Sequence, residues 1–167
     1  MDNIILVGFM GTGKSAAGRL LAKRLKRPFI DLDERIERKA GQSIPAIFEK
    51  SGEAGFRRME SEAVREAAGL KGHVIATGGG VMLDEANVAA LKRSGTLICL
   101  TARPDVIISR TSAGIAARPL LVGSDPETKV RELLKLREPF YAKADMTLDT
   151  SDKPVERVVD EIMRKLK

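Results

Sequence analysis

Short apolar runs alternate along the chain with longer segments in which apolar residues recur every three or four positions. Such runs are typical of strands buried on both faces, and we predict strands at 4–7, 29–30, 74–76, 96–100 and 146–148. The segments between them have the spacing of amphipathic helices, as at Leu20, Leu21 and Leu25 and again over 155–166. The alternation predicts an α/β fold, with a parallel sheet of about five strands and helices on both faces.

The segment 112–124 departs from this alternation. It lies between predicted helices at 105–111 and 127–143, and it combines small residues, two glycines and a proline. In a phosphotransferase such a segment is a candidate mobile lid, while the alternative is an ordinary surface connection. Arg118 in its middle favours the lid. The length of 167 residues predicts one domain over 1–167.

The sequence GFMGTGKS at 8–15 directly follows the first predicted strand and opens onto a helical pattern. It fits the phosphate-binding loop G-x-x-x-x-G-K-[ST]. Glycines allow the backbone N–H groups to turn around an anion, Lys14 reaches the β- and γ-phosphates, and the Ser15 hydroxyl ligates Mg²⁺. The predicted phosphate-binding residues are Gly11, Thr12, Gly13, Lys14, Ser15 and Ala16.

A dinucleotide-binding fingerprint is the alternative for the same loop. Gly11, Gly13 and Ala16 fit G-x-G-x-x-G/A, and Asp31 and Asp33 lie where a ribose-binding acid is expected. That alternative gives no role to the lysine inside the loop, and the complete P-loop pattern is the more specific of the two.

Two carboxylates, Asp31 and Asp33, follow the second predicted strand. Alternation along an extended strand would send both side chains to one side at its carboxyl edge, where ligands bind in open α/β sheets. One is then suited to hold Mg²⁺ through water, and the other to accept the proton of an attacking hydroxyl. The alternative, Asp33 as a helix N-cap, does not account for the pair.

Two further motifs are candidate parts of an acid-binding site. Arg57 and Glu60 lie three positions apart, so a helix would bring Glu60 beside the guanidinium and orient it toward a ligand carboxylate. The alternative is a surface ion pair. TGGG at 77–80 follows the strand predicted at 74–76, where backbone without side chains can approach a polyhydroxylated ligand closely; a plain flexible turn is the alternative.

The remaining candidate cations, Arg110, Arg118 and Arg137, belong to the later half of the chain. We expect Arg118 to neutralise charge on the transferring phosphate and Arg137 to pair with Arg57 around an acid. Cys99 lies within an apolar run and is expected to be a buried thiol, whereas His73 is expected at the surface without a role.

Composition narrows the class of partner. The net charge is +6, but aromatic residues make up only 4% and no basic run alternates with them, which argues against nucleic acid and favours small anionic substrates. No apolar run reaches membrane-spanning length, and the first strand begins within three residues of Met1. We therefore expect a cytoplasmic protein without a membrane partner, and a monomer.

Taken together, GFMGTGKS, Asp31-Leu32-Asp33, GEAGFRRME, TGGG, RPLL and REPFY follow one another in an order and spacing that resembles the shikimate kinases over essentially the whole chain. The resemblance implies a P-loop kinase fold of the nucleoside-monophosphate-kinase type with a mobile lid. It also implies transfer of the γ-phosphoryl group of ATP, with one Mg²⁺, to the 3-hydroxyl of shikimate. The products are shikimate 3-phosphate and ADP, on the route to chorismate and aromatic amino acids.

The resemblance also implies roles for individual residues. The catalytic residues are Asp33, as the base, with Lys14 and Arg118. The shikimate-binding residues are Asp33, Arg57, Gly78, Gly79, Gly80 and Arg137, with apolar walls from Phe48 and Phe56. The ATP-binding residues are the P-loop set with Arg110, Arg118 and Pro154, and the last of these flanks the adenine together with Arg110. The Mg²⁺ ligands are Ser15 and Asp31.

The chain departs from the family pattern at two places, and three other functions are alternatives to this interpretation. The lid segment ahead of Arg118 is unusual in composition, and Pro45 either displaces the helix behind the shikimate pocket or begins it. One alternative is a kinase of the same fold for another polyol acid such as gluconate. The others are a GTP-dependent switch, which lacks an Asn-Lys-x-Asp motif here, and a kinase homologue that only binds ligands.

Overall fold

The computed structural model describes residues 1–111 and 125–167. The segment 112–124, and with it the predicted lid and Arg118, lies outside the described residues. Five parallel strands form one sheet in the order β2-β3-β1-β4-β5. The strands are β1 (Asn3–Val7), β2 (Phe29–Asp31), β3 (Val74–Ala76), β4 (Gly95–Thr101) and β5 (Met146–Asp149). All five predicted strands are confirmed, and each boundary differs by no more than one residue.

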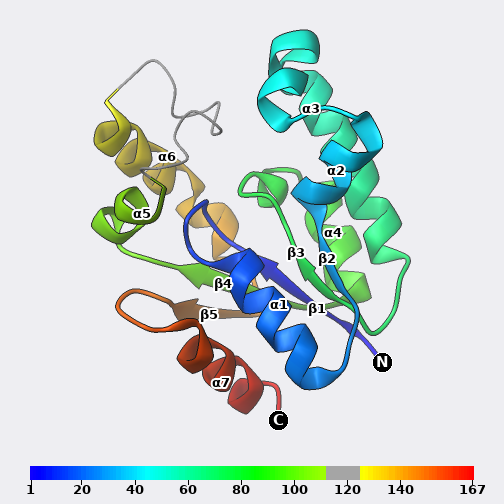
Figure 1. Ribbon diagram of the computed structural model, residues 1–167, viewed down its shortest axis with the longest axis vertical. Helices are drawn as coiled ribbons and strands as arrows, with labels where there is room; N and C mark the ends of the chain where they lie inside the picture. Colours follow the sequence, from blue (N-terminus) through cyan, green and yellow to red (C-terminus); the bar gives the residue numbers. More distant parts are fainter. Residues whose placement is uncertain (112–124) are drawn as a thin grey trace.

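Seven α-helices and one short 3-10 helix alternate with these strands in the described part of the chain (Figure 1). They are α1 (Lys14–Leu25), α2 (Leu32–Ala40), α3 (Ile44–Ala68), η1 (Val81–Leu83), α4 (Glu85–Ser94), α5 (Pro104–Thr111), α6 (Pro126–Tyr141) and α7 (Val155–Lys165). The helices expected at 105–111 and 127–143 are therefore confirmed as α5 and α6, and α6 ends two residues earlier than expected. None of the helices described is long and apolar enough to cross a membrane.

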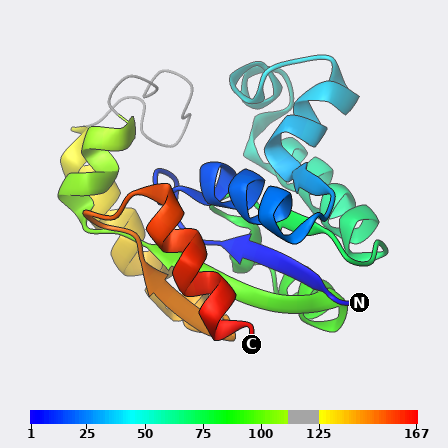
Figure 2. The ribbon, with the colours of Figure 1, turned by 60° about the horizontal axis from the view of Figure 1, so that its bottom comes forward.

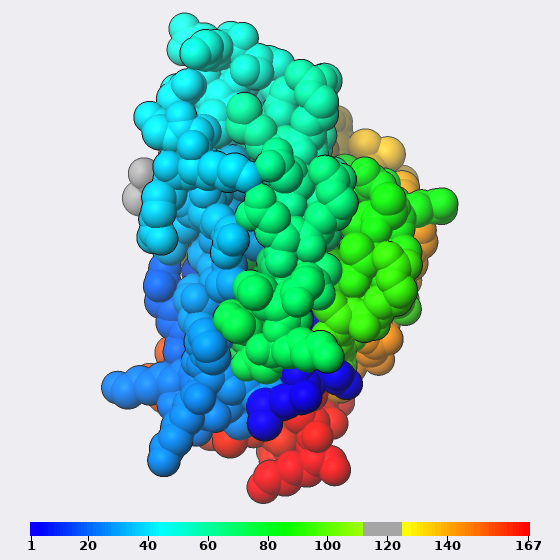
Figure 3. Space-filling model, turned by 90° about the vertical axis from the view of Figure 1, so that its right-hand side faces the viewer, coloured from blue at the N-terminus to red at the C-terminus, as the bar shows by residue number. Residues whose placement is uncertain are grey.

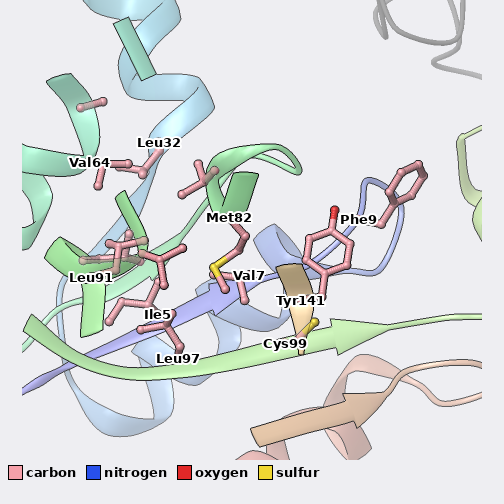
Figure 4. Packing of buried hydrophobic residues seen from close by; sticks show 14 of the residues in the cluster. Ile5, Val7, Phe9, Leu32, Val64, Met82, Leu91, Leu97, Cys99 and Tyr141 are labelled. Carbon is pink, nitrogen blue, oxygen red and sulfur yellow. The ribbon is translucent and has the colours of Figure 1, made fainter. Parts of the chain in front are cut away.

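Side chains of the central strand β1 alternate between two hydrophobic clusters, one on each face of the sheet. Ile4 and Leu6 pack with residues of α1 and α7, which lie side by side in Figure 2. Ile5 and Val7 pack on the opposite face with residues of α2 to α6, including Leu91 (Figure 4). Each fully buried side chain of this size contributes about 1.5–3 kcal/mol to folding. This packing confirms the predicted helices on both faces.

Helix α3 begins with a conventional cap and is bent within its first half. The Ser43 hydroxyl accepts a hydrogen bond from the backbone N–H of Ala46, and Pro45 lies in the first turn. Of the two alternatives for Pro45, the structure therefore shows the helix start. Gly52 then has φ 68° and ψ 179°, which breaks the helical path. Figure 3 shows the face formed by α2 and α3, with α4 beside α3.

Because all five strands are parallel, their carboxyl ends meet at one edge of the sheet. The loop 8–13 follows β1, Asp31 ends β2, and TGGG at 77–80 follows β3 (Figure 1). The residue Thr150 follows β5. The fold thus brings the motifs that follow β1, β2 and β3 directly to this edge, while Arg57 and Arg137 lie on the helices α3 and α6.

Candidate active site

The loop after β1 has the backbone conformation of an anion-binding cradle. Gly8, Gly11 and Gly13 all have positive φ. A Cβ atom at Gly8 would lie 2.2 Å from the carbonyl oxygen of Leu100, so only glycine fits between β1 and β4. Gly13 caps α1 without any side-chain hydrogen bond to the first turn. The positive end of α1 therefore faces the loop with backbone donors that suit a phosphate.

The Lys14 side chain is buried inside this loop, with an exposed fraction of 9%. Its ammonium group donates hydrogen bonds of 2.8 Å to the carbonyl oxygens of Gly8 and Phe9. The Thr12 hydroxyl donates to the same Phe9 carbonyl at 2.7 Å. These bonds hold a positive charge at the centre of the cradle, next to the N-terminus of α1.

Ser15 and Asp31 meet beside the loop. The Ser15 hydroxyl donates to Asp31 Oδ2 at 2.5 Å, while Asp31 Oδ1 accepts from the backbone N–H groups of Asp33 and Glu34 at 3.0 and 3.2 Å. Asp31 is thus the N-cap of α2. A hydroxyl and a carboxylate oxygen side by side are the hard donors that Mg²⁺ prefers when phosphates complete its coordination.

This cap corrects the expected geometry of the acidic pair. β2 ends at Asp31, and Asp33 lies in the first turn of α2 rather than on an extended strand. The expectation that strand alternation aligns the two side chains is wrong, and so is the alternative that Asp33 itself is the N-cap. The Asp31 carboxylate satisfies two N–H groups of the first turn, and this favours a helix from Leu32 onward.

Both aspartates nevertheless line one cavity with the P-loop. It has a volume of about 210 Å³, and its walls include Lys14, Ser15, Asp31, Asp33, Thr77 and Gly79. The cavity joins the phosphate loop to the residues that follow β2 and β3. A phosphate bound by the loop and an alcohol held near Asp33 would share it.

Gly79 and Gly80 each lie beneath an arginine. A Cβ atom at Gly80 would lie 2.3 Å from Nη1 of Arg57, and one at Gly79 would lie 3.3 Å from Nη1 of Arg137. The Arg57 guanidinium of α3 thus occupies the space that a side chain at Gly80 would need, and the Arg137 guanidinium of α6 lies close to Gly79. The structure thus brings the predicted arginine pair to the predicted glycine run.

Gly78 lies beneath two carboxylates. Its Cβ atom would lie 2.8 Å from Glu60 Oε2 and 2.9 Å from Asp33 Oδ1. The predicted contact between Arg57 and Glu60 is confirmed, with Nη1 donating to Oε1 at 2.8 Å. Glu60 is only 2% exposed, and within the described residues its Oε2 has no hydrogen-bond partner. Burial raises the pKa of Glu60, and the charges of Arg57 and Arg137 oppose that rise.

Arg137 is buried beside the aromatic ring of Phe9. It is 4% exposed, and its guanidinium carbon lies 5.4 Å from the centre of the Phe9 ring. One turn along α6, the Tyr141 hydroxyl donates to the Gly79 carbonyl at 2.7 Å, and burial raises the pKa of Tyr141 to about 12. Sequence reasoning missed Tyr141, although its spacing of four residues from Arg137 is a helical signal.

Phe48 and Phe56, the two residues expected as apolar walls, contact each other. Their ring centres lie 5.0 Å apart, on either side of the bend at Gly52. The guanidinium carbon of Arg57 lies 5.3 Å from the Phe56 ring centre. Met10 and Met59 are partly buried and pack against the hydrophobic core.

A second cavity, of about 290 Å³, lies on the other side of the P-loop. Its walls include Thr12, Gly13, Ala16, Arg110, Thr150 and Lys153. Arg110 lines this cavity, whereas Pro154 caps α7 between two lining residues without lining the cavity itself. Sequence reasoning missed Thr150, and no motif or periodicity marks it.

Glu60 predicts a specific dependence of stability on pH. Its pKa is raised above the ordinary value of 4.5 in the folded chain, so its contribution to stability is largest below that value and is lost as pH rises through the folded pKa. In the Glu60→Gln variant the side chain at this position does not titrate. We expect the free energy of unfolding of the wild type, relative to Glu60→Gln, to fall between pH 4.5 and 7.5.

Urea unfolding of both proteins across this pH range measures the difference. Glu49→Gln is the matched control, because Glu49 is exposed on the same helix. The difference in free energy of unfolding between the wild type and this variant should not change across the pH range. A wild-type advantage that grows with pH would contradict the prediction.

A P-loop at the end of the central strand of an all-parallel sheet, facing carboxylates and paired arginines, defines a P-loop kinase. The comparison with known families gives the particular group. The sequence model of the shikimate kinase family matches residues 10–167, and the chain belongs to this family. It is therefore an enzyme that uses ATP as phosphoryl donor.

Relatives and solved structures agree with this assignment. A shikimate kinase from Caldanaerobacter subterraneus is 51% identical over 164 residues, which cover 98% of this chain and 95% of the relative. The structure of a shikimate kinase from Acinetobacter baumannii in complex with shikimate has a TM-score of 0.95 at 41% identity, covering 99% of this chain and 93% of that one. A shikimate kinase from Aquifex aeolicus has a TM-score of 0.83 at 37% identity, covering 98% and 95%.

A gluconokinase from Sinorhizobium meliloti also resembles the chain, with a TM-score of 0.60 at 16% identity over 99% of this chain and 91% of that one. That likeness shows a shared fold and nothing about the acceptor.

Proposed function

We propose that the chain transfers the γ-phosphoryl group of ATP to the 3-hydroxyl of shikimate, giving shikimate 3-phosphate and ADP in aromatic amino-acid biosynthesis. The observation that carries the proposal is the placement of Arg57 and Arg137 against Gly80 and Gly79, beside the cavity of the P-loop. Two converging guanidinium groups suit a carboxylate, and the Asp33 carboxylate suits a hydroxyl. Shikimate carries both groups on one ring.

On the nucleotide side, the backbone of the P-loop binds the phosphates and Lys14 contacts the β- and γ-phosphates. Ser15 Oγ and Asp31 Oδ2, which lie 2.5 Å apart, would hold one Mg²⁺ together with phosphate oxygens. The ion would neutralise charge on the phosphates. Arg110 and Pro154 are proposed to flank the adenine.

On the acceptor side, Asp33 accepts the proton of the attacking hydroxyl while the arginines fix the carboxylate of the ring. Gly78, Gly79 and Gly80 let the ring approach the backbone, and Phe48 and Phe56 cover its apolar side. Catalysis then consists mainly of positioning and charge neutralisation, as in other phosphoryl transfers. Arg118, from the segment 112–124 that we propose as the lid, adds positive charge at the transferred group.

The proposal also includes the oligomeric state, the cellular location and the partners of the enzyme. We propose one domain over 1–167 that acts as a monomer in the cytoplasm, without nucleic-acid or membrane partners. Small soluble substrates agree with this setting, and so does the buried free thiol of Cys99.

A coupled assay of ADP release tests the proposal. The purified protein receives ATP and Mg²⁺ with shikimate, with gluconate, or with no acceptor. We expect rapid ADP release only in the sample that contains shikimate, and formation of shikimate 3-phosphate in an amount equal to the ADP released. Equal rates with and without shikimate, or faster release with gluconate, would refute it.

Replacing Arg57 by methionine should weaken shikimate binding in particular. The change removes a charge-assisted contact to the ring carboxylate and leaves the P-loop intact, so KM for shikimate should rise about tenfold to a hundredfold while KM for ATP stays nearly constant. Steady-state kinetics with each substrate varied in turn measures both constants. Arg58→Met is the matched control, since the neighbouring Arg58 is exposed and should tolerate the change. Equal increases in both KM values would contradict the assignment.

A further inference from the structure

A hydrogen-bond network on the nucleoside side of the P-loop centres on Thr150. This residue directly follows β5 and is 3% exposed. Its hydroxyl lies 3.0 Å from Nη1 of Arg110, 2.8 Å from the Thr12 carbonyl and 3.0 Å from the Thr101 carbonyl. A hydroxyl has one proton and two lone pairs, so it accepts from Arg110 while it donates to a carbonyl. One side chain thus links α5, the P-loop and the ends of β4 and β5.

The network fixes an arginine that would otherwise be free to move. Arg110 is exposed, yet Nη1 donates to the Thr150 hydroxyl and to the Gly11 carbonyl at 3.2 Å, and Nη2 donates to the Thr150 carbonyl at 2.9 Å. Three bonds from the planar fork define one position for the guanidinium. Its rotamer freedom is therefore already lost before a ligand binds, and this lowers the entropic cost of binding.

The hydroxyl is not needed to anchor the backbone at this point. The backbone N–H of Thr150 already donates to the Thr101 carbonyl at 2.8 Å, and this bond continues the pairing of β4 with β5. The contacts that the hydroxyl adds beyond this pairing go to Arg110 and to Thr12. Both of these residues line the 290 Å³ cavity beside the phosphate loop, as does Thr150.

We propose that Thr150 is a positioning residue for the nucleotide. Its hydroxyl holds Arg110 and the Thr12 carbonyl in the arrangement that binds the nucleoside part of ATP. The inference rests on the proposed function in one respect, because it takes the 290 Å³ cavity as the nucleoside site. Thr150 acts through Arg110 and the P-loop, and the acceptor side is untouched by it.

Calorimetric titration with ADP tests the proposal. Thr150→Val keeps the shape of the side chain and removes the hydroxyl, so ADP should bind about tenfold more weakly, as expected for one lost bond to a charged group. Thr150→Ser restores the hydroxyl and should recover most of the affinity. Shikimate binding, measured in the same way, should be unchanged in both variants. In Thr150→Val the KM for ATP should rise, while the KM for shikimate should stay the same.

The matched control is Thr147→Val, which removes an exposed hydroxyl from β5 away from both cavities. It should leave ADP and shikimate binding unchanged. If Thr150→Val weakened both ligands equally, or if the serine variant bound ADP as weakly as the valine variant, a structural role would replace the positioning role.

A second variant keeps the test independent of folding at Thr150. Arg110→Lys retains the charge on an exposed side chain but lacks the fork that bonds Thr150 and Gly11, so it should also weaken ADP binding about tenfold. Unchanged ADP affinity in this variant would overturn the proposal. ADP binding requires no acceptor, so a wild type that binds ADP and ignores shikimate would refute the proposed function while leaving this inference standing.

Discussion

Replacing Lys14 by methionine is expected to lower kcat about a hundredfold to a thousandfold. The lysine is buried in the P-loop and held by the Gly8 and Phe9 carbonyls at 2.8 Å, and in the proposed complex it contacts the β- and γ-phosphates. Methionine fills a similar volume and provides no charge. The transition state would then lose a positioned donor where negative charge moves from the γ-phosphoryl group toward ADP.

Steady-state kinetics at saturating shikimate measures this loss. Shikimate affinity, measured by calorimetry without nucleotide, should be nearly unchanged, because the proposed carboxylate ligands Arg57 and Arg137 lie on α3 and α6 and not in the P-loop. Lys23→Met is the matched control on the same helix, where the side chain is exposed, and it should keep full activity. A Lys14→Met enzyme with kcat within a few-fold of the wild type would remove the P-loop lysine from the mechanism.

Replacing Asp33 by asparagine is expected to lower kcat by about a hundredfold or more. Asparagine keeps the size of the side chain but accepts no proton. Asp33 lies in the first turn of α2, and its Oδ1 faces the Gly78 backbone on the wall that the shikimate hydroxyls would contact. The loss should therefore affect chemistry more than binding, with a smaller rise in KM for shikimate and none for ATP.

The adjacent acid provides the control for this variant. Glu34 is exposed and pairs with Arg19 on the outside of the molecule, so Glu34→Gln should leave both kcat and KM unchanged. An Asp33→Asn enzyme that retained kcat but bound shikimate weakly would make Asp33 a binding residue only. The attacking hydroxyl would then lose its proton to solvent or to phosphate.

Local patterns predicted most of the fold and the P-loop. Strand runs, the glycine spacing at 8–13 and the contact between Arg57 and Glu60 depend on residues close together in the sequence, and all are confirmed. The prediction for Cys99 is confirmed too, since the thiol is buried and burial raises its pKa to about 11. The expected alignment of Asp33 with Asp31 failed for a local reason as well, because the cap at Asp31 begins a helix at Leu32.

The contacts that Tyr141 and Thr150 make with distant segments were not predicted by any pattern. Tyr141 reaches the Gly79 carbonyl, and Thr150 reaches Arg110 and Thr12, only because parallel strands and their helices bring these segments to the same edge. Periodicity shows which face of an element is buried but not which residue of another element meets it. The bend at Gly52 was not predicted either.

The sheet order has a consequence for how the chain acquires its structure during synthesis. Ile5 of the central strand pairs with Ile75 on one side and Leu97 on the other, so the P-loop strand has no neighbour until β3 has left the ribosome and gains its second neighbour only after β4 has followed. Contacts of such long sequence separation slow folding and leave an apolar strand unpaired in the nascent chain. Translation past β4 is therefore required before the cradle at 8–13 can close against Leu100.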